Sequence, residues 1–138
     1  MALLVAIHMV REVRILADLP VMPLVPAEDL ERARRFYELT LGLRLLRATQ
    51  TEAWYECQNG RTLRLYLKPA PAASVSLSWE VPDINKVIRQ LSQKGIVFEG
   101  REEAARKAER PPCGPPVVRA IRFKDTEGNL VDLAQFHG

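Results

Sequence analysis

Histidine and cysteine, the residue types that most often bind transition metals, are scarce in this sequence. Among its 138 residues there are two histidines, His8 and His137, and both lie at the ends of the chain. The two cysteines, Cys57 and Cys113, stand in unlike contexts with no CxxC or His-Cys spacing. We therefore expect no structural zinc site, and we expect reduced thiols in a cytoplasmic protein.

Long hydrophobic runs and blocks of one charge are also missing. The apolar opening MALLVAIHMV spans ten residues and leads at once into REVR, so it is too short to cross a bilayer and lacks the order of a signal peptide. We interpret residues 1–20 as an N-terminal arm that covers part of the core or a partner subunit, with Met9 as an alternative start. The 20 basic and 17 acidic residues are interleaved, which favours a small anionic ligand over nucleic acid.

The remaining composition, 47% hydrophobic and 27% charged, is that of one globular domain. The segment DLERARRFYELTLGL (29–43) predicts an amphipathic helix, because its apolar residues from Leu30 to Leu41 recur at spacings of three and four. Asp29 is a suitable N-cap and Gly42 a suitable C-terminal stop. Because they belong to this apolar stripe, the aromatic residues of the helix are expected to pack in the core.

Strand patterns surround that helix, and the whole unit recurs. VMPLV precedes it, and LRLLRAT, AWYECQ and TLRLYL follow it, with QNG as a hairpin turn. After the linker PAPAA come SVSLSWEV, a helix capped by Asp83, IVFEG, and the strands VVRAIRF and NLVDLAQF joined by KDTEGN. Asp29 and Asp83 are 54 residues apart and Gly60 and Gly128 are 68 apart, because REEAARKAERPPCGPP is inserted in the second copy.

The sequence therefore predicts an α+β fold of two tandem βαβββ modules, residues 21–70 and 71–138, within a single domain. One helix on one small sheet leaves the other face of that sheet bare. A second copy supplies the opposing half of a cleft, so the modules are expected to form a curved sheet around it. We expect the inserted segment 101–116 to lie over the open end of the second sheet as a lid, with Cys113 exposed and without a base that would make it a nucleophile.

The order of these motifs resembles the glyoxalase/bleomycin-resistance/extradiol-dioxygenase superfamily, whose members are also called vicinal oxygen chelate proteins. The resemblance covers residues 21–136 and is carried by DLERARRFYELTLGL, DINKVIRQLSQKGIVFEG and FKDTEGNLVDLAQF. It implies paired βαβββ modules around a pocket, usually in a homodimer. MPLVPAEDLERA further resembles the bleomycin-resistance branch, whose cavity binds its ligand without a catalytic metal. The net charge of +3 disfavours cationic bleomycin itself as the ligand.

Enzymes of this family generally hold divalent Zn, Ni, Fe or Mn with His and Glu side chains at equivalent places in both modules. The resemblance maps those places onto Met22, Arg64, Ser76 and Asp132, of which only Asp132 is a ligand that hard metals prefer. Both histidines fall outside every motif position. We therefore expect no metal and no other cofactor.

Alternation along the strands selects candidate ligand-binding residues. Ser76, Ser78 and Glu80 share one face of their strand, while Trp79 alternates to the other face and is assigned to the core. Trp54 and Tyr55 are adjacent, so one of them lines the cleft and stacks on a planar or apolar ligand. The candidate set is Met22, Trp54, Arg64, Tyr66, Ser76, Ser78, Glu80 and Asp132.

Three functions are compatible with these residues. In the first, a metal-free homodimer binds a small anionic or aromatic molecule, and Arg64 receives a carboxylate or enolate. In the second, a diverged isomerase, lyase or dioxygenase-type enzyme uses Asp132 or Glu80 as its base and Arg64 as the oxyanion partner. In the third, the N-terminal arm bridges subunits. Arg64 and Asp132 could instead form a buried salt bridge in place of the metal. No membrane partner is expected.

Overall fold

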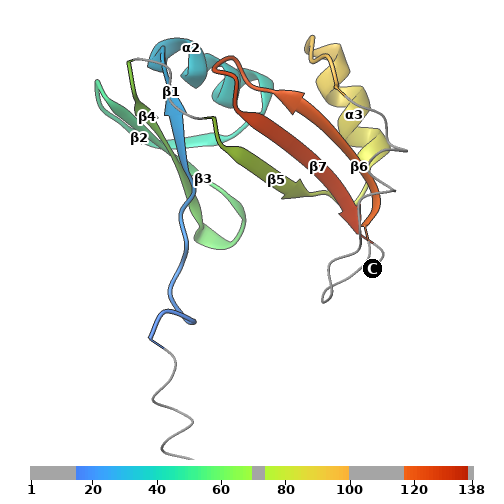
Figure 1. The fold of residues 1–138 in the computed structure, drawn as a ribbon, viewed down its shortest axis with the longest axis horizontal. Helices are drawn as coiled ribbons and strands as arrows, with labels where there is room; N and C mark the ends of the chain where they lie inside the picture. The colour runs from blue at the N-terminus through green and yellow to red at the C-terminus, as the bar shows by residue number, and fades with distance from the viewer. Residues whose placement is uncertain (1–14, 70–73, 100–116, 137–138) are drawn as a thin grey trace, which may run out of the picture.

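The computed structural model describes residues 15–69, 74–99 and 117–136, and it has two sheets with a helix packed on each (Figure 1). The first sheet has four strands in the order β1-β4-β3-β2, with β1 parallel to β4 and the other pairs antiparallel. No helix in these ranges is long and apolar enough to cross a membrane. The first module consists of β1 (Leu24–Ala27), α2 (Leu30–Arg35), η1 (Phe36–Thr40), β2 (Arg44–Ala48), β3 (Glu52–Glu56), η2 (Gln58–Gly60) and β4 (Thr62–Leu67).

The second module repeats this order with one strand fewer among the described residues. Its three strands run in the order β5-β7-β6, and β5 is parallel to β7 as β1 is to β4. The predicted strand IVFEG contributes a single bridge, from Glu99 to Arg122, and Phe98 holds this segment by packing edge-on against Phe123 at 5.7 Å. The elements are β5 (Ser76–Glu80), α3 (Ile84–Gln93), β6 (Val117–Lys124) and β7 (Leu130–Phe136).

Both helices begin where the sequence predicts. The Asp29 carboxylate accepts a hydrogen bond from the Arg32 N–H at 3.0 Å, and Asp83 accepts one from the Lys86 N–H at 3.2 Å. The first helix continues as a π-helical turn, in which the Leu41 N–H donates to the Phe36 carbonyl at 3.0 Å.

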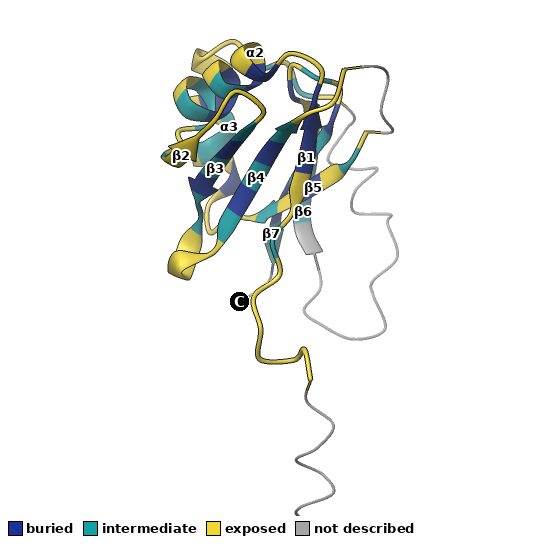
Figure 2. Cartoon of the chain, turned by 90° about the vertical axis from the view of Figure 1, so that its left-hand side faces the viewer, coloured by how far each residue is buried: buried dark blue, intermediate teal, exposed yellow. Residues whose placement is uncertain are grey.

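A hydrophobic core joins the two modules among the described residues. Phe36 of the first module lies 6.4 Å from Phe123 of the second, and Tyr37 stacks on Tyr55 at 6.3 Å. Trp79 packs against this core, as the alternation of its strand predicts. Figure 2 shows buried and half-buried residues alternating along β3 and β4. The fold is therefore the predicted α+β arrangement of two modules.

The turn between β6 and β7 fastens the second module to the first through buried polar groups. Asp125 accepts a hydrogen bond from the Tyr37 hydroxyl at 2.7 Å and one from the Asn129 side chain at 2.8 Å. The same Asn129 amide donates to the Pro26 carbonyl at 3.0 Å, and its oxygen accepts from the Val75 N–H at 3.1 Å. Asp125 and Asn129 tolerate burial because each of these side chains has hydrogen-bond partners.

Glu127 of this turn caps the helix of the other module. Its carboxylate accepts from the Asp29 N–H at 2.8 Å and from Nε of Arg32 at 2.8 Å. Burial raises the pKa of Glu127, but the hydrogen bonds from Arg32, Asp29 and Thr126 outweigh that effect and lower it to about 2. The ionised carboxylate is thus part of the junction between modules at neutral pH.

Candidate functional site

The face of the first sheet opposite to α2 carries polar and aromatic side chains. Along β3 and β4 every second residue is buried against the helix side, and the residues between them are half-buried. This period of two is typical of a sheet covered on one face. We call the uncovered side the open face of the first sheet, to which β3 and β4 contribute Glu52, Trp54, Glu56, Thr62, Arg64 and Tyr66.

Trp54 stands between two arginines on this open face. The strand register pairs Arg47 with Trp54 and Trp54 with Arg64, so the three residues form a row across β2, β3 and β4. The guanidinium carbon of Arg47 lies 5.2 Å from the centroid of the indole, and that of Arg64 lies 5.7 Å from it. Cation–π contacts of this kind orient guanidinium groups. We call Arg47, Trp54 and Arg64 the cationic row.

The sequence predicted that either Trp54 or Tyr55 stacks on a planar or apolar ligand. Trp54 is the member of the Trp54–Tyr55 pair that lies on the open face, and Tyr55 is buried. The indole, however, contacts guanidinium groups of its own chain. The row therefore presents positively charged N–H donors that could bind a ligand. The indole of Trp54 holds these donors in place.

Arg64 has one weak partner and one donor without a partner. Its Nη1 lies 3.5 Å from Oε1 of Glu52, and 27% of its side chain is exposed. Its Nε is buried and makes no hydrogen bond to any described residue. A buried donor without an acceptor costs about 1–3 kcal/mol. The exposed part of the Arg64 side chain can receive an oxyanion, whereas a ligand reaches the buried Nε only if the side chain moves.

Asp132 lies on the corresponding face of the second sheet, where its partner is Arg122. Arg122 donates from Nε to Oδ1 of Asp132 at 2.6 Å and from Nη2 to Oδ2 at 3.1 Å. Hydrogen bonding to Asp132 raises the pKa of Arg122. The alternative of a salt bridge between Arg64 and Asp132 is wrong, because each residue pairs within its own sheet. Asp132 pairs with Arg122 directly opposite it, and Arg64 pairs with Glu52, a diagonal neighbour on the adjacent strand.

The four positions onto which the resemblance maps the metal ligands carry residues that do not fit a divalent ion. Asp132, the only carboxylate of the four, has both oxygens engaged by Arg122. At another of these four positions Arg64 places a cation. Met22 and Ser76 supply a thioether and an exposed hydroxyl at the remaining two. Nowhere in the described ranges do three or more His, Cys, Asp or Glu side chains gather to hold a metal ion.

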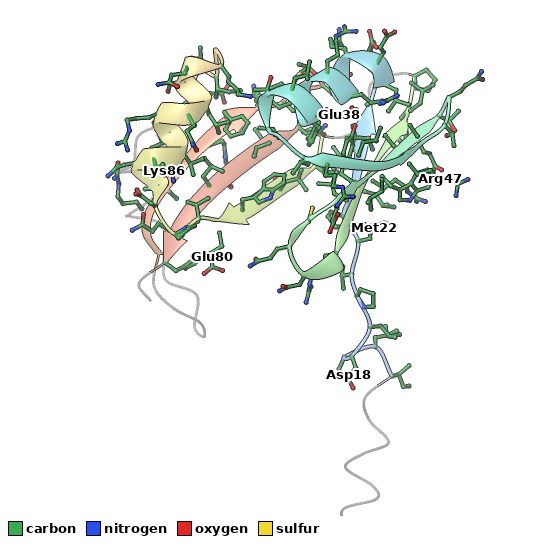
Figure 3. All side chains as sticks on the ribbon, turned by 180° about the vertical axis from the view of Figure 1, so that it is seen from behind. Asp18, Met22, Glu38, Arg47, Glu80 and Lys86 are labelled. Carbon is green, nitrogen blue, oxygen red and sulfur yellow. The ribbon has the colours of Figure 1, made fainter. Side chains whose placement is uncertain are left out.

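The other predicted residues divide between the modules. Tyr66 shares the open face of the first sheet with the cationic row, and Met22 is half-buried just before β1. Figure 3 shows Met22 and Arg47 on the first module and Glu80 on the second. Ser76, Ser78 and Glu80 are exposed on β5, and the ladder places Ser78 opposite Asp132.

A surface hollow of about 240 Å³ lies where the two modules meet, and we call it the junction hollow. It is formed by the segment before β1, the turn leading into β4, and β5. Burial raises the pKa of the Cys57 thiol in its wall, so this thiol is protonated at neutral pH. The lining residues are Val21, Pro23, Cys57, Arg61, Thr62, Leu63, Leu77, Ser78 and Trp79.

Several of these residues lie outside the set predicted from the sequence. Glu52 was detectable, because it lies two positions before Trp54 on the same face of the strand. Arg47 and Arg122 become neighbours of Trp54 and Asp132 only through strand register, which the sequence does not display. The predictions for His8, His137, Cys113, residues 1–14 and the insertion 101–116 lie outside the described residues.

Comparisons with known proteins agree with this geometry. The profile of the family described as "Glyoxalase/Bleomycin resistance protein/Dioxygenase superfamily" matches residues 19–133. No curated protein matches the chain. Similar solved structures include a lactoylglutathione lyase from Agrobacterium tumefaciens, with 16% identity, a TM-score of 0.66, and coverage of 86% of this chain and 93% of that one.

Two further structures extend the comparison. A virulence protein from Salmonella typhimurium is 22% identical, with a TM-score of 0.67 and coverage of 87% of this chain and 98% of that one. TnmS3, an antibiotic binding protein from a Streptomyces species, is 25% identical, with a TM-score of 0.59 and coverage of 86% of this chain and 95% of that one.

Proposed function

Because the chain belongs to the glyoxalase/bleomycin resistance/dioxygenase superfamily, we propose that it binds a small anionic molecule at the open face of its first sheet without a metal ion. The observation that carries this proposal is Arg64, a partly exposed cation whose one ion pair, with Glu52, is long at 3.5 Å, at a position onto which the resemblance maps a metal ligand. A guanidinium keeps its charge when partly buried and binds a carboxylate or enolate with two parallel hydrogen bonds.

The cationic row supports the proposal by its arrangement. Arg47 and Arg64 approach Trp54 from the two neighbouring strands, so two positive groups stand on one face of a rigid sheet. Groups held in place before binding lose less conformational entropy when the ligand arrives. TnmS3, which is 25% identical to this chain, is an antibiotic binding protein, and a binding role for this chain accords with that.

The enzymatic alternative finds less support. It requires Asp132 or Glu80 to act as a base opposite Arg64, yet Asp132 is engaged at both oxygens by Arg122. The carboxylate beside Arg64 is that of Glu52, which neutralises part of its charge. No described pair thus reproduces the expected arrangement of base and oxyanion partner.

Substitution of Arg64 tests the proposed function. Trp79→Phe leaves Trp54 as the sole tryptophan, so its fluorescence reports on the cationic row. In this background we expect benzoate to change the fluorescence saturably, and Arg64→Met to remove the response while the circular dichroism spectrum is unchanged. Arg89→Met, at an exposed arginine on α3, is the matched control and should bind as the parent does. Equal binding by Arg64→Met and the parent would contradict the proposal.

We also propose that the protein acts as a homodimer in the cytoplasm, with the segment before β1 in the contact. Ile15, Leu16, Leu19 and Val21 are 79%, 72%, 57% and 77% exposed, and this segment extends away from the sheets (Figures 1 and 3). Exposed apolar side chains gathered in this way mark contact surfaces. Light scattering should find a dimer that Leu16→Asp with Leu19→Asp dissociates, whereas Val97→Asp, at an equally exposed position, should leave it intact.

A further inference from the structure

The junction hollow has an apolar interior and one charged lining residue. Leu63 and Leu77 are 1% and 9% exposed at its base, and Trp79 packs against the core beside them. The hydroxyls of Thr62 and Ser78 complete the wall on the open side. The single charged residue among the lining residues is Arg61, and it forms no ion pair with a described residue. The described lining of the hollow thus combines apolar surface with the positive charge of Arg61.

The size of the hollow limits what it can hold. Its volume of about 240 Å³ lies below the range of roughly 300–1,000 Å³ typical of pockets that enclose a whole drug-sized ligand. It is large enough for one aromatic ring or a short alkyl chain. A ligand that fills it therefore extends beyond it.

The geometry of β4 shows where such a ligand continues. Thr62 lines the hollow, and Arg64 follows two residues later on the same open face. Alternate residues of a strand are about 7 Å apart. A group leaving the hollow along β4 therefore arrives beside Arg64, of whose side chain 27% is exposed. Arg61 precedes the strand at the other side of Thr62.

We infer that the junction hollow binds the apolar end of an amphipathic monoanion, an aryl- or alkyl-carboxylate, whose carboxylate is held by Arg64, while Arg61 adds positive charge beside the hollow. Because the hollow supplies apolar contact, binding should require the apolar end of the ligand as well as its charge. The inference rests on the proposed function for the role of Arg64, whereas the hollow and Arg61 are observations of their own.

A thiol in the hollow allows a direct test with 4-phenylbutyrate. Cys113→Ser leaves Cys57 as the sole cysteine, and Trp54 is kept because it orients Arg64. We expect 4-phenylbutyrate to change the tryptophan fluorescence saturably and to slow alkylation of Cys57 by iodoacetamide at least tenfold. Acetate and 4-phenylbutanol, which lack the tail and the charge respectively, should bind at least tenfold more weakly.

Substitutions separate the hollow from the cationic row. Ser78→Phe fills the hollow and should weaken 4-phenylbutyrate binding at least tenfold, whereas Ser92→Phe adds the same ring to an exposed position of α3 and should have no effect. Arg61→Met and Arg64→Met should each weaken binding about fivefold or more, against Arg89→Met as the control. Circular dichroism of every variant verifies that it is folded.

The outcomes distinguish this inference from the proposed function. If 4-phenylbutyrate binding needs Arg64 but leaves Cys57 alkylation unchanged, the hollow is overturned and the proposed function stands. If Cys57 is protected and only Arg61→Met weakens binding, the hollow stands and the role of Arg64 fails. If folded Ser78→Phe binds as tightly as the parent, or the alcohol binds as tightly as the acid, the inference is wrong.

Discussion

Replacing Glu127 by Gln should weaken the junction between the modules in a pH-dependent way. The Glu127 side chain is 1% exposed, and its pKa of about 2 in the folded protein compares with an ordinary value of 4.5. At about 1.4 kcal/mol per pH unit, this difference corresponds to about 3 kcal/mol of stability from ionised Glu127. Solvent screening at Arg32, which is 45% exposed, reduces the expected value to about 2 kcal/mol.

The sign of the pH dependence follows from the lowered pKa. The stabilisation is fully present above pH 4.5 and is lost as the pH falls toward 2, because protonation removes the charge that Arg32 and the Asp29 N–H bind. Glutamine resembles protonated glutamate. The cost of Glu127→Gln should therefore be about 2 kcal/mol at pH 7 and should approach zero near pH 2.

Urea unfolding of both proteins at pH 7, 5 and 3, followed by circular dichroism, measures this difference. Glu31→Gln is the control, because Glu31 is 85% exposed and pairs with Arg35 on the surface of the same helix. It should cost less than about 0.5 kcal/mol at every pH. A cost of Glu127→Gln that is equal at pH 7 and pH 3 would refute the reasoning.

Three further predictions concern stability and metal dependence. Tyr37→Phe removes the hydroxyl that donates to buried Asp125 and should lower the free energy of unfolding by about 1–1.5 kcal/mol in urea titrations, and an unchanged midpoint would contradict it. Gly128→Ala should cost about 1–2 kcal/mol, because Gly128 has a φ of +86° while an added Cβ would meet no atom within 4 Å; a melting temperature equal to that of the parent would show the backbone to be unstrained. Dialysis against EDTA should leave benzoate binding unchanged, and restoration of lost binding by a divalent metal would oppose the account.

Local signals in the sequence were sufficient to predict the elements of the fold. Asp29 and Asp83 cap helices as their positions suggested, and alternation along β5 placed Trp79 against the core. These features depend on hydrogen bonds and burial within a few residues of one another. The segment IVFEG was predicted to be a strand, but among the described residues it forms a single bridge. That bridge depends on Arg122 of β6, which is distant in sequence.

The partners within the site could not be predicted in the same way. A one-residue change in register turns a different side chain toward its neighbour, and β2 contains an irregularity between Leu45 and Arg47 that determines what Trp54 faces. The pairing of Asp132 with Arg122 likewise follows from the β6–β7 ladder. The sequence therefore indicated which residues reach the open faces and left their partners undetermined.

Native mass spectrometry of the protein purified from its cells tests the central claim most directly. The account predicts that the chain retains a small anion and no divalent metal, that Arg64→Met loses the anion, and that Arg89→Met keeps it. A stoichiometric transition metal in the protein, or equal retention of the anion by Arg64→Met, would contradict the account.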